Sequence, residues 1–243
     1  LMYAQYEEIL RNALKHGQDV HWVRANVAET NRPEQVREAL WTVDLMNRVG
    51  MRTDVLLGGS GPTVRTWGRK EFPPLAEWRT NAAEVVKLTD AAFGHHNVYM
   101  GFGDEPSPQW LREKRPAFIA FQDVGMKFIL ASWGAIFAVN PFAMDWQNIG
   151  GSPEGGVELA NKWNQLGMRS GWYAGHHVGP ENPAFCRRQY GFSPYFGGYS
   201  AVCNYAHHLG PYNDDTTTYK PMCFFYGVYD GVLDTLQWEG FRE

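Results

Sequence analysis

The sequence predicts an α/β fold of the (β/α)₈ barrel type, in which a parallel strand and a helix alternate along the chain. Apolar runs with strand character alternate with segments that carry an apolar stripe at helical spacing. A short glycine-containing joint recurs between the two kinds of segment. The length of 243 residues is typical of one such barrel. We therefore treat residues 1–243 as a single barrel domain, truncated at both ends.

The recurring joint has the pattern aliphatic-Gly-Met-cation, and it marks three ends of helices. It occurs at residues 49–52, 124–127 and 166–169, each time after a helical pattern and before a strand-like run. Glycine suits the left-handed backbone position just past a helix. A repeated passage from helix to strand is what a βαβ series requires.

The helices are predicted from apolar stripes and from their capping residues. Residues 34–49 place Val36, Leu40, Val43 and Met46 on one face. Ser107-Pro108 has the pattern of a helix cap followed by a first helical residue. Helices are expected at 3–15, 34–49, 75–93, after 107, at 153–166 and at 183–190.

Strands are predicted where short apolar runs lie between these helices. They are expected at 21–27, 53–57, 98–102, 128–132, 143–148, 170–173, 201–205 and 222–226. If 3–15 is the first helix of the barrel, the first strand lies before Leu1. The Gly-rich run 58–61 lacks the spacing of a phosphate-binding loop, so we interpret it as a barrel loop.

Composition excludes several classes of partner. The net charge of −4 gives no basic face for nucleic acid. The longest apolar run, 128–144, is too short and too interrupted to span a membrane. The three cysteines show no metal-binding spacing, and we interpret them as small buried side chains.

An adjacent pair of carboxylates directly follows a predicted strand. Asp104 and Glu105 come after the apolar run 98–102, and Pro106 stops the strand. In a barrel the carboxyl ends of the strands carry the active site. Two close carboxylates that share a cavity raise the pKa of one of them, which suits a general acid. The competing interpretation is a solvated turn that caps the next helix.

Aromatic and polar residues follow other predicted strands, where stacking on a sugar ring and hydrogen bonding to its hydroxyls are expected. These candidate substrate-binding residues are Trp133, Trp172, Tyr173, His176, Asn204 and Tyr205. The paired histidines at 95–96, 176–177 and 207–208 lack the spacing of a zinc site, so we predict no metal and no cofactor.

Three motifs in this order resemble glycoside hydrolase family 123, whose members include β-N-acetylgalactosaminidases. They are Gly-Asp-Glu-Pro at 103–106, Trp-Tyr at 172–173, and the terminal run 226–243, which contains Trp238. The resemblance covers most of the chain from about residue 20. It implies a (β/α)₈ barrel and an accessory β-sandwich that this chain lacks. Gln237 stands where members of the family often carry an arginine.

The resemblance also implies a substrate-assisted hydrolysis, in which the 2-acetamido group of the sugar acts as the nucleophile. Glu105 would then be the general acid and base, and Asp104 would orient the acetamido group. Trp238 joins the candidate substrate-binding residues. The expected partner is a glycan rather than nucleic acid, and the resemblance favours an extracellular or periplasmic location. Neither the sugar epimer nor the oligomeric state follows from the sequence.

Two alternatives stay open. In a conventional glycosidase, Asp145 or Glu239 would supply a second carboxylate, and its separation from Glu105 would set a retaining or an inverting outcome. In the other alternative, the barrel binds glycans or serves as a structural module without turnover.

Overall fold

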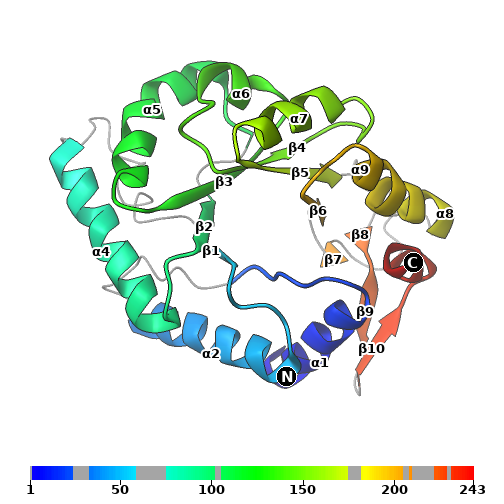
Figure 1. The fold of residues 1–243 in the computed structure, drawn as a ribbon. Coiled ribbons are helices and arrows are strands. Elements are labelled where there is room, and N and C mark those ends of the chain that lie inside the picture. The colour runs from blue at the N-terminus through cyan, green and yellow to red at the C-terminus, as the bar shows by residue number, and fades with distance from the viewer. Residues whose placement is uncertain are drawn as a thin grey trace. The chain divides into compact units, whose positions relative to one another are not determined.

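The computed structural model describes residues 2–23, 33–58, 75–101, 105–174, 182–204, 208–209, 222–228 and 231–243. These residues form two compact units. One unit spans Val20–Gln147, and the other combines Leu1–Asp19 with Asn148–Glu243. Figure 1 shows the elements of both.

The unit Val20–Gln147 alternates strands with helices along the chain. Its elements are α2 (Pro33–Val49), β1 (Leu56–Gly58), α4 (Leu75–Phe93), β2 (Val98–Gly101), α5 (Pro108–Gln122), β3 (Lys127–Ser132) and α6 (Ala135–Val139), and β4 (Trp146–Ile149) begins at its end. In Figure 1, α4 and α5 lie next to each other on the outer side of β2 and β3.

The other unit begins with α1 and contains the remaining strands. Its elements are α1 (Met2–Lys15), α7 (Val157–Gln165), β5 (Arg169–Ala174), α8 (Pro183–Cys186), the π-helix η1 (Arg187–Phe192), α9 (Ser193–Phe196), β6 (Ala201–Asn204), β7 (His208–Leu209), β8 (Met222–Cys223), β9 (Phe225–Val228), β10 (Gly231–Asp234) and α10 (Leu236–Arg242). Strands β9 and β10 form an antiparallel hairpin, and β7 pairs with β8.

Six strands form one sheet in the order β1-β2-β3-β4-β5-β6, which is also their order in the sequence. The strands run parallel, as in the register Gly101 to Ile129 between β2 and β3. A sheet that grows in one direction differs from a doubly wound sheet, in which the strand order reverses at a switch point. The predicted (β/α)₈ class of fold is confirmed.

The three predicted joints close their helices with the same pair of hydrogen bonds. At the end of α5, the Gly125 N–H donates to Gln122 O, and the Met126 N–H donates to Phe121 O. The glycine has a φ of 93°, which is the left-handed conformation that this cap requires. The joints after α2 and α7 repeat both bonds, around Gly50 and Gly167.

Strands β1 and β4 are shorter than the sequence predicts and β3 and β5 are longer, whereas α1, α2 and α4 match their predicted ranges to within one residue. Within the predicted strand 21–27, the described part forms one parallel bridge, between Trp22 and Leu57. Strand β1 begins three residues later than predicted, and β4 begins at Trp146 rather than at residue 143. Short strands carry little periodicity of their own, so their ends depend on pairing with neighbours.

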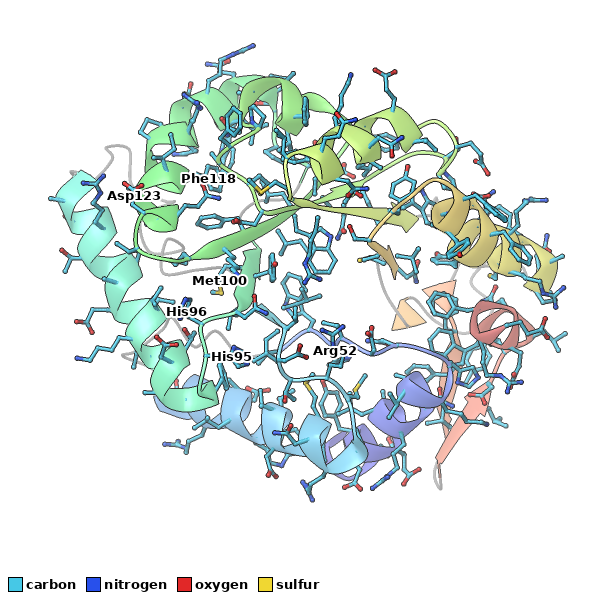
Figure 2. All side chains as sticks on the ribbon, in the orientation of Figure 1. Arg52, His95, His96, Met100, Phe118 and Asp123 are labelled. Carbon is cyan, nitrogen blue, oxygen red and sulfur yellow. The ribbon has the colours of Figure 1, made fainter. Side chains whose placement is uncertain are left out.

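Phenylalanines fill the space between α5 and the sheet in the first unit. Phe118 of α5 meets Phe128 of β3 edge to face, with ring centroids 5.0 Å apart, and Phe121 lies beside the same ring. Figure 2 labels Phe118 on the inner side of α5. These contacts fix α5, and with it the segment that enters the helix, against β3.

The second unit has an aromatic core of its own. It is formed by Trp172, Tyr190, Phe224, Phe225 and Trp238, together with Cys186. The indole of Trp238 lies 4.6 Å from the ring of Phe224, centroid to centroid. This cluster holds the β9–β10 hairpin and α10 against the helical segment 183–196. Among the described residues, no helix is both long and apolar enough to cross a membrane.

Candidate active site

Glu105 lies between β2 and α5 with an unusual backbone conformation. Its φ of 41° makes it the single non-glycine residue with positive φ in the described part of the chain. The next residue is the buried Pro106, and a residue that precedes proline ordinarily prefers extended backbone. Such outliers cost about 1–3 kcal/mol and are enriched at functional sites. The exposed Glu105 side chain is therefore a candidate for chemistry.

The helix after Glu105 begins as predicted. The Ser107 hydroxyl accepts a hydrogen bond from the Trp110 N–H at 3.2 Å, and Pro108 occupies the first turn. This cap fixes the first turn of α5 only two residues beyond Glu105. The predicted cap therefore forms at Ser107, and the exposed Glu105 in the bend before it fits both the solvated turn and the strand-end acid.

Trp133 follows β3, the neighbour of β2, at an equivalent place. Gly101 and Ile129 are paired across the two strands, and Glu105 and Trp133 each come four residues later (105 − 101 = 133 − 129). The Trp133 side chain is 61% exposed, which is unusual for so large an apolar group. An exposed indole beside the carboxyl end of a parallel strand is suited to stacking on a sugar ring.

Several predicted site residues cannot be placed. Asp104, His176 and Tyr205 lie outside the described residues, so their positions relative to Glu105 stay predictions. His177 and His207, which belong to the histidine pairs 176–177 and 207–208, also lie outside the described residues.

Trp172 and Tyr173 lie in β5, as predicted. The Trp172 side chain is 1% exposed, and its indole N–H donates to Gly151 O at 2.7 Å. Its ring meets the Tyr190 ring edge to face. Trp172 therefore packs within its own unit, while Tyr173, the next residue, is partly exposed.

Asn204 is the last residue of β6 and is held by a buried tyrosine. The Tyr190 hydroxyl donates to Asn204 Oδ1 at 2.8 Å. Desolvation raises the pKa of Tyr190 well above its usual value, with smaller contributions from Cys186 and Cys203, so the hydroxyl keeps its proton and stays a donor. This bond orients the amide at the carboxyl end of the strand.

Cys203, the residue before Asn204, is not a poised nucleophile. Desolvation raises the pKa of its thiol to about 12, although a hydrogen bond with Asn148 opposes the shift. A thiol with so high a pKa stays protonated at neutral pH. Burial likewise raises the pKa of Cys186 to about 11. Cys186 fits the prediction of a buried cysteine, whereas Cys203 is only partly buried.

Trp238 lies in α10 and is 1% exposed. Its indole N–H donates to Asn12 Oδ1 at 2.7 Å, and its ring stacks on the imidazole of His16 at 4.7 Å between centroids. The sequence singled out Trp238 but not His16, because a lone histidine after a helix carries no motif. The spacing from His16 to Glu239 is too long for any local pattern.

The two carboxylates of the conventional alternative occupy other kinds of position. Asp145 precedes β4 instead of following a strand, and its Oδ2 accepts hydrogen bonds from the Phe128 N–H at 2.8 Å and from Gln122 at 3.0 Å. It thus lies at the amino end of β3 and β4, whereas Glu105 follows the carboxyl end of β2. Glu239 lies in α10 and pairs with Arg242.

The adjacent histidines His95 and His96 have separate partners. His95 Nε2 lies 2.6 Å from Thr53 O, and His96 Nδ1 lies 2.9 Å from Asp90 Oδ1. Figure 2 shows both near the start of β2, at the end of the strand remote from Glu105. Among the described residues, one group of side chains could hold a metal ion, and it consists of His16, Asp234 and Glu239.

No protein-family model matches the sequence. No curated protein matches it either.

The fold is similar to solved structures of glycoside hydrolases. The endoglucanase Cel5A of Pseudomonas stutzeri superposes with a TM-score of 0.55 at 14% identity, over 97% of this chain and 84% of that one. Its complex with cellobiose gives a TM-score of 0.51, also at 14% identity, over 97% of this chain and 82% of the other. An α-L-arabinofuranosidase of Thermotoga maritima gives 0.48 at 10% identity, over 83% of this chain and 50% of the other.

At this level of identity the similarity shows the fold, because one barrel architecture carries many activities.

Proposed function

We propose that this chain is a glycoside hydrolase that removes a terminal N-acetylhexosamine, with β-N-acetylgalactosamine as the preferred sugar. The proposed catalytic domain comprises residues 1–243. Glu105 carries the proposal, because it combines an exposed carboxyl group, a position just past a parallel strand of a (β/α)₈ fold, and a backbone conformation that is unfavourable for glutamate.

In the proposed reaction the sugar supplies its own nucleophile. The carbonyl oxygen of the 2-acetamido group bonds to the anomeric carbon as the bond to the leaving oxygen breaks, and Glu105 transfers its proton to that oxygen. Glu105 then removes a proton from water, which attacks the anomeric carbon and regenerates the acetamide. Asp104 accepts a hydrogen bond from the acetamido N–H and stabilises the positive charge that develops on the ring intermediate. The configuration at the anomeric carbon is retained.

This mechanism accounts for two neighbouring carboxylates, since one serves the leaving group and the other serves the acetamide. It requires no enzyme nucleophile on the far side of the sugar. That agrees with the position of Asp145, whose carboxylate is engaged with Phe128 and Gln122 at the amino end of its strand.

Aromatic and amide groups near strand ends would bind the sugar. Trp133 is the strongest of these candidates, because its indole is exposed next to the β3 end. Asn204 is oriented by Tyr190 and would donate to or accept from a hydroxyl. Tyr173, His176 and Tyr205 complete the proposed set, while Trp172 and Trp238, each 1% exposed, pack in the aromatic core.

The test compares three aryl glycosides that share one leaving group. The substrates are 4-nitrophenyl N-acetyl-β-galactosaminide, N-acetyl-β-glucosaminide and plain β-galactoside, and kcat/KM is measured for each. We expect turnover of the N-acetylated substrates only. Equal turnover of the plain galactoside would indicate a conventional pair of carboxylates instead. Binding of glycans without turnover would indicate a non-catalytic barrel.

The variant Glu105→Gln identifies the acid. We expect its kcat/KM to fall about 10²- to 10⁴-fold, as is typical for loss of a general acid or base. The loss should be smaller for a 2,4-dinitrophenyl glycoside, because that leaving group needs little protonation. Glu113→Gln is the matched control, since Glu113 is an exposed glutamate on α5. Full activity of Glu105→Gln would refute the assignment.

A further inference from the structure

Three side chains from different elements direct one atom each toward a common point in the unit that holds α1 and α10. His16 follows α1, Asp234 ends β10, and Glu239 lies in the first turn of α10. His16 Nε2 lies 3.6 Å from Asp234 Oδ2 and 3.5 Å from Glu239 Oε1. The three atoms all lie within 4.8 Å of one another.

The imidazole of His16 is fixed in one tautomer by the backbone. Its Nδ1 lies 2.8 Å from Asn12 O, and a carbonyl oxygen only accepts hydrogen bonds, so Nδ1 carries the proton. In the neutral ring Nε2 is then a bare lone pair. The His16 side chain is fully buried, and among the described residues Nε2 has no hydrogen-bond partner. A buried nitrogen without a partner is costly unless it holds a ligand.

Each of the three residues is also held through its other polar atom. Asn12 Nδ2 donates to Asp234 Oδ1, and Arg242 Nε donates to Glu239 Oε2 at 2.7 Å. Asn12 is itself fixed, because its Oδ1 accepts from the Trp238 indole. Outer hydrogen bonds that lock the ring and the carboxylates while leaving one atom of each unused are typical around metal ligands.

We propose that His16 Nε2, Asp234 Oδ2 and Glu239 Oε1 bind one Zn²⁺ ion, with water as a fourth ligand. Two ligands about 2.1 Å from a tetrahedral zinc ion lie about 3.4 Å apart, close to both observed distances from Nε2. The imidazole donor disfavours Ca²⁺ and Mg²⁺, which take oxygen ligands. Two carboxylates balance the charge of the ion.

Two cationic side chains lie beside the carboxylate ligands. Arg242 pairs with Glu239 through Oε2, the oxygen that does not face His16. One cation competes for the site, because Lys15 Nζ lies 3.9 Å from Asp234 Oδ2. Lys15 is largely exposed, so its ammonium group can turn to solvent when an ion binds.

The role assigned to the ion is structural. Its ligands join α1 to the segment that contains β10 and α10, which lies more than two hundred residues further along the chain. The ring of one ligand stacks on Trp238, a member of the aromatic core. An ion that binds only the folded state stabilises it by mass action. This proposal is independent of the proposed glycosidase activity.

The test uses the whole chain after treatment with a chelator and dialysis. Titration calorimetry with Zn²⁺, and visible absorption with Co²⁺ as a spectroscopic probe, report binding and geometry. We expect one Zn²⁺ per chain, a rise in Tm with added Zn²⁺, and Co²⁺ bands of tetrahedral intensity. Ca²⁺ and Mg²⁺ at the same concentrations should neither bind nor shift Tm.

Three variants test the assignment of the ligands. His16→Gln and Glu239→Gln should each abolish saturable binding, and either one suffices if the other fails to fold. His96→Gln is the matched control, because His96 is an exposed histidine paired with Asp90, and it should bind Zn²⁺ like the native chain. Lys15→Gln should tighten binding by removing the competing charge.

Two results would overturn the proposal. One is the absence of saturable Zn²⁺ and Co²⁺ binding by the folded native chain, which would leave the three residues as an ion-paired cluster. The other is unchanged Zn²⁺ affinity in folded His16→Gln or Glu239→Gln.

Discussion

The backbone N–H of Phe128 donates to the carboxylate of Asp145 at 2.8 Å, which ties the second residue of β3 to the residue just before β4. The Asp145 side chain here accepts a backbone N–H of β3, as a carbonyl oxygen of a neighbouring strand does elsewhere in a sheet. The pKa of Asp145 is raised by burial, and the hydrogen bonds from Phe128 and Gln122 and the charge of Lys127 offset only part of that shift.

Asp145→Asn is expected to change how stability depends on pH. A raised pKa in the folded state means that the folded protein keeps a proton that the unfolded chain releases above about pH 3.8. The contribution of Asp145 to stability is therefore full below that pH and decreases as the pH rises through the folded-state pKa. Asparagine stays neutral, and its Oδ1 accepts both hydrogen bonds. The free energy of unfolding of Asp145→Asn, relative to the native chain, should rise between pH 4 and pH 7 in urea titrations.

Glu158→Gln provides a control of opposite sign. The hydrogen bond and charge of Lys162 lower the pKa of Glu158, so its contribution is present above the unfolded value of 4.5 and is lost as the pH falls. The free energy of unfolding of Glu158→Gln should therefore fall further below that of the native chain as the pH rises. A relative stability of Asp145→Asn that is flat or falls with pH would contradict the assignment.

Changes at Glu105 should separate stability from activity. Glycine adopts a φ of 41° without the steric penalty of a side chain. We expect Glu105→Gly to be more stable than Glu105→Ala by about 1 kcal/mol, because both lack the carboxyl group and only one keeps the strain. Both should be inactive. Chemical denaturation measures the difference, and equal stability of the two variants would show that the backbone is not strained.

Removing the Trp133 indole should weaken substrate binding without weakening the fold. The side chain is exposed, and substitutions at such positions change stability by about 0.5 kcal/mol or less. Under the proposed function, Trp133→Ala should raise KM about tenfold, equivalent to ~1.4 kcal/mol. Phe142→Ala removes another exposed aromatic ring, 65% exposed, and should leave KM unchanged. A lower Tm of Trp133→Ala than of the native chain would indicate a packing role instead.

Gly240 is expected to tolerate no side chain. A Cβ at this position in α10 would lie 2.7 Å from Pro183 Cα and nearer still to the carbonyl oxygen of Pro183. Backbone cannot give way as a flexible side chain does, so Gly240→Ala should destabilise by about 1–3 kcal/mol. Gly191→Ala is the control, since a Cβ there meets nothing within 4 Å. Thermal unfolding compares the two, and equal Tm values would contradict the close approach of α8 and α10.

The sequence predicts most of the described helices, because the signals are local, but it misses α6 and α10 and places the start of α7 four residues too early. The apolar stripe of 34–49 and the glycine at 50 lie within one segment, and α2 and its cap form there. Strand limits such as that at Trp146 are less predictable, since pairing between distant segments decides where a short strand begins.

The sites show the same division between local and distant signals. Glu105 was found because its neighbours in sequence are a strand and a proline. Its positive φ was not foreseen, because torsion depends on the surrounding packing. His16 was missed because its partners, Asp234 and Glu239, lie more than two hundred residues further along the chain. Only the packed structure brings such residues together.

The π-helix η1 determines how the segment 183–196 would respond to the loss of one residue. Its hydrogen bonds span one more residue than those of the α-helices on either side, so 183–196 holds one residue more than a continuous α-helix between the same ends. Loss of a single codon, such as that for Gly191, would restore a regular helix. Because the wider turns absorb that one residue, the α-helical turns on either side would keep their relative orientation. The hydroxyl of Tyr190 reaches Asn204 from within these wider turns, so we expect the deletion to act chiefly on that hydrogen bond and not on the helices on either side.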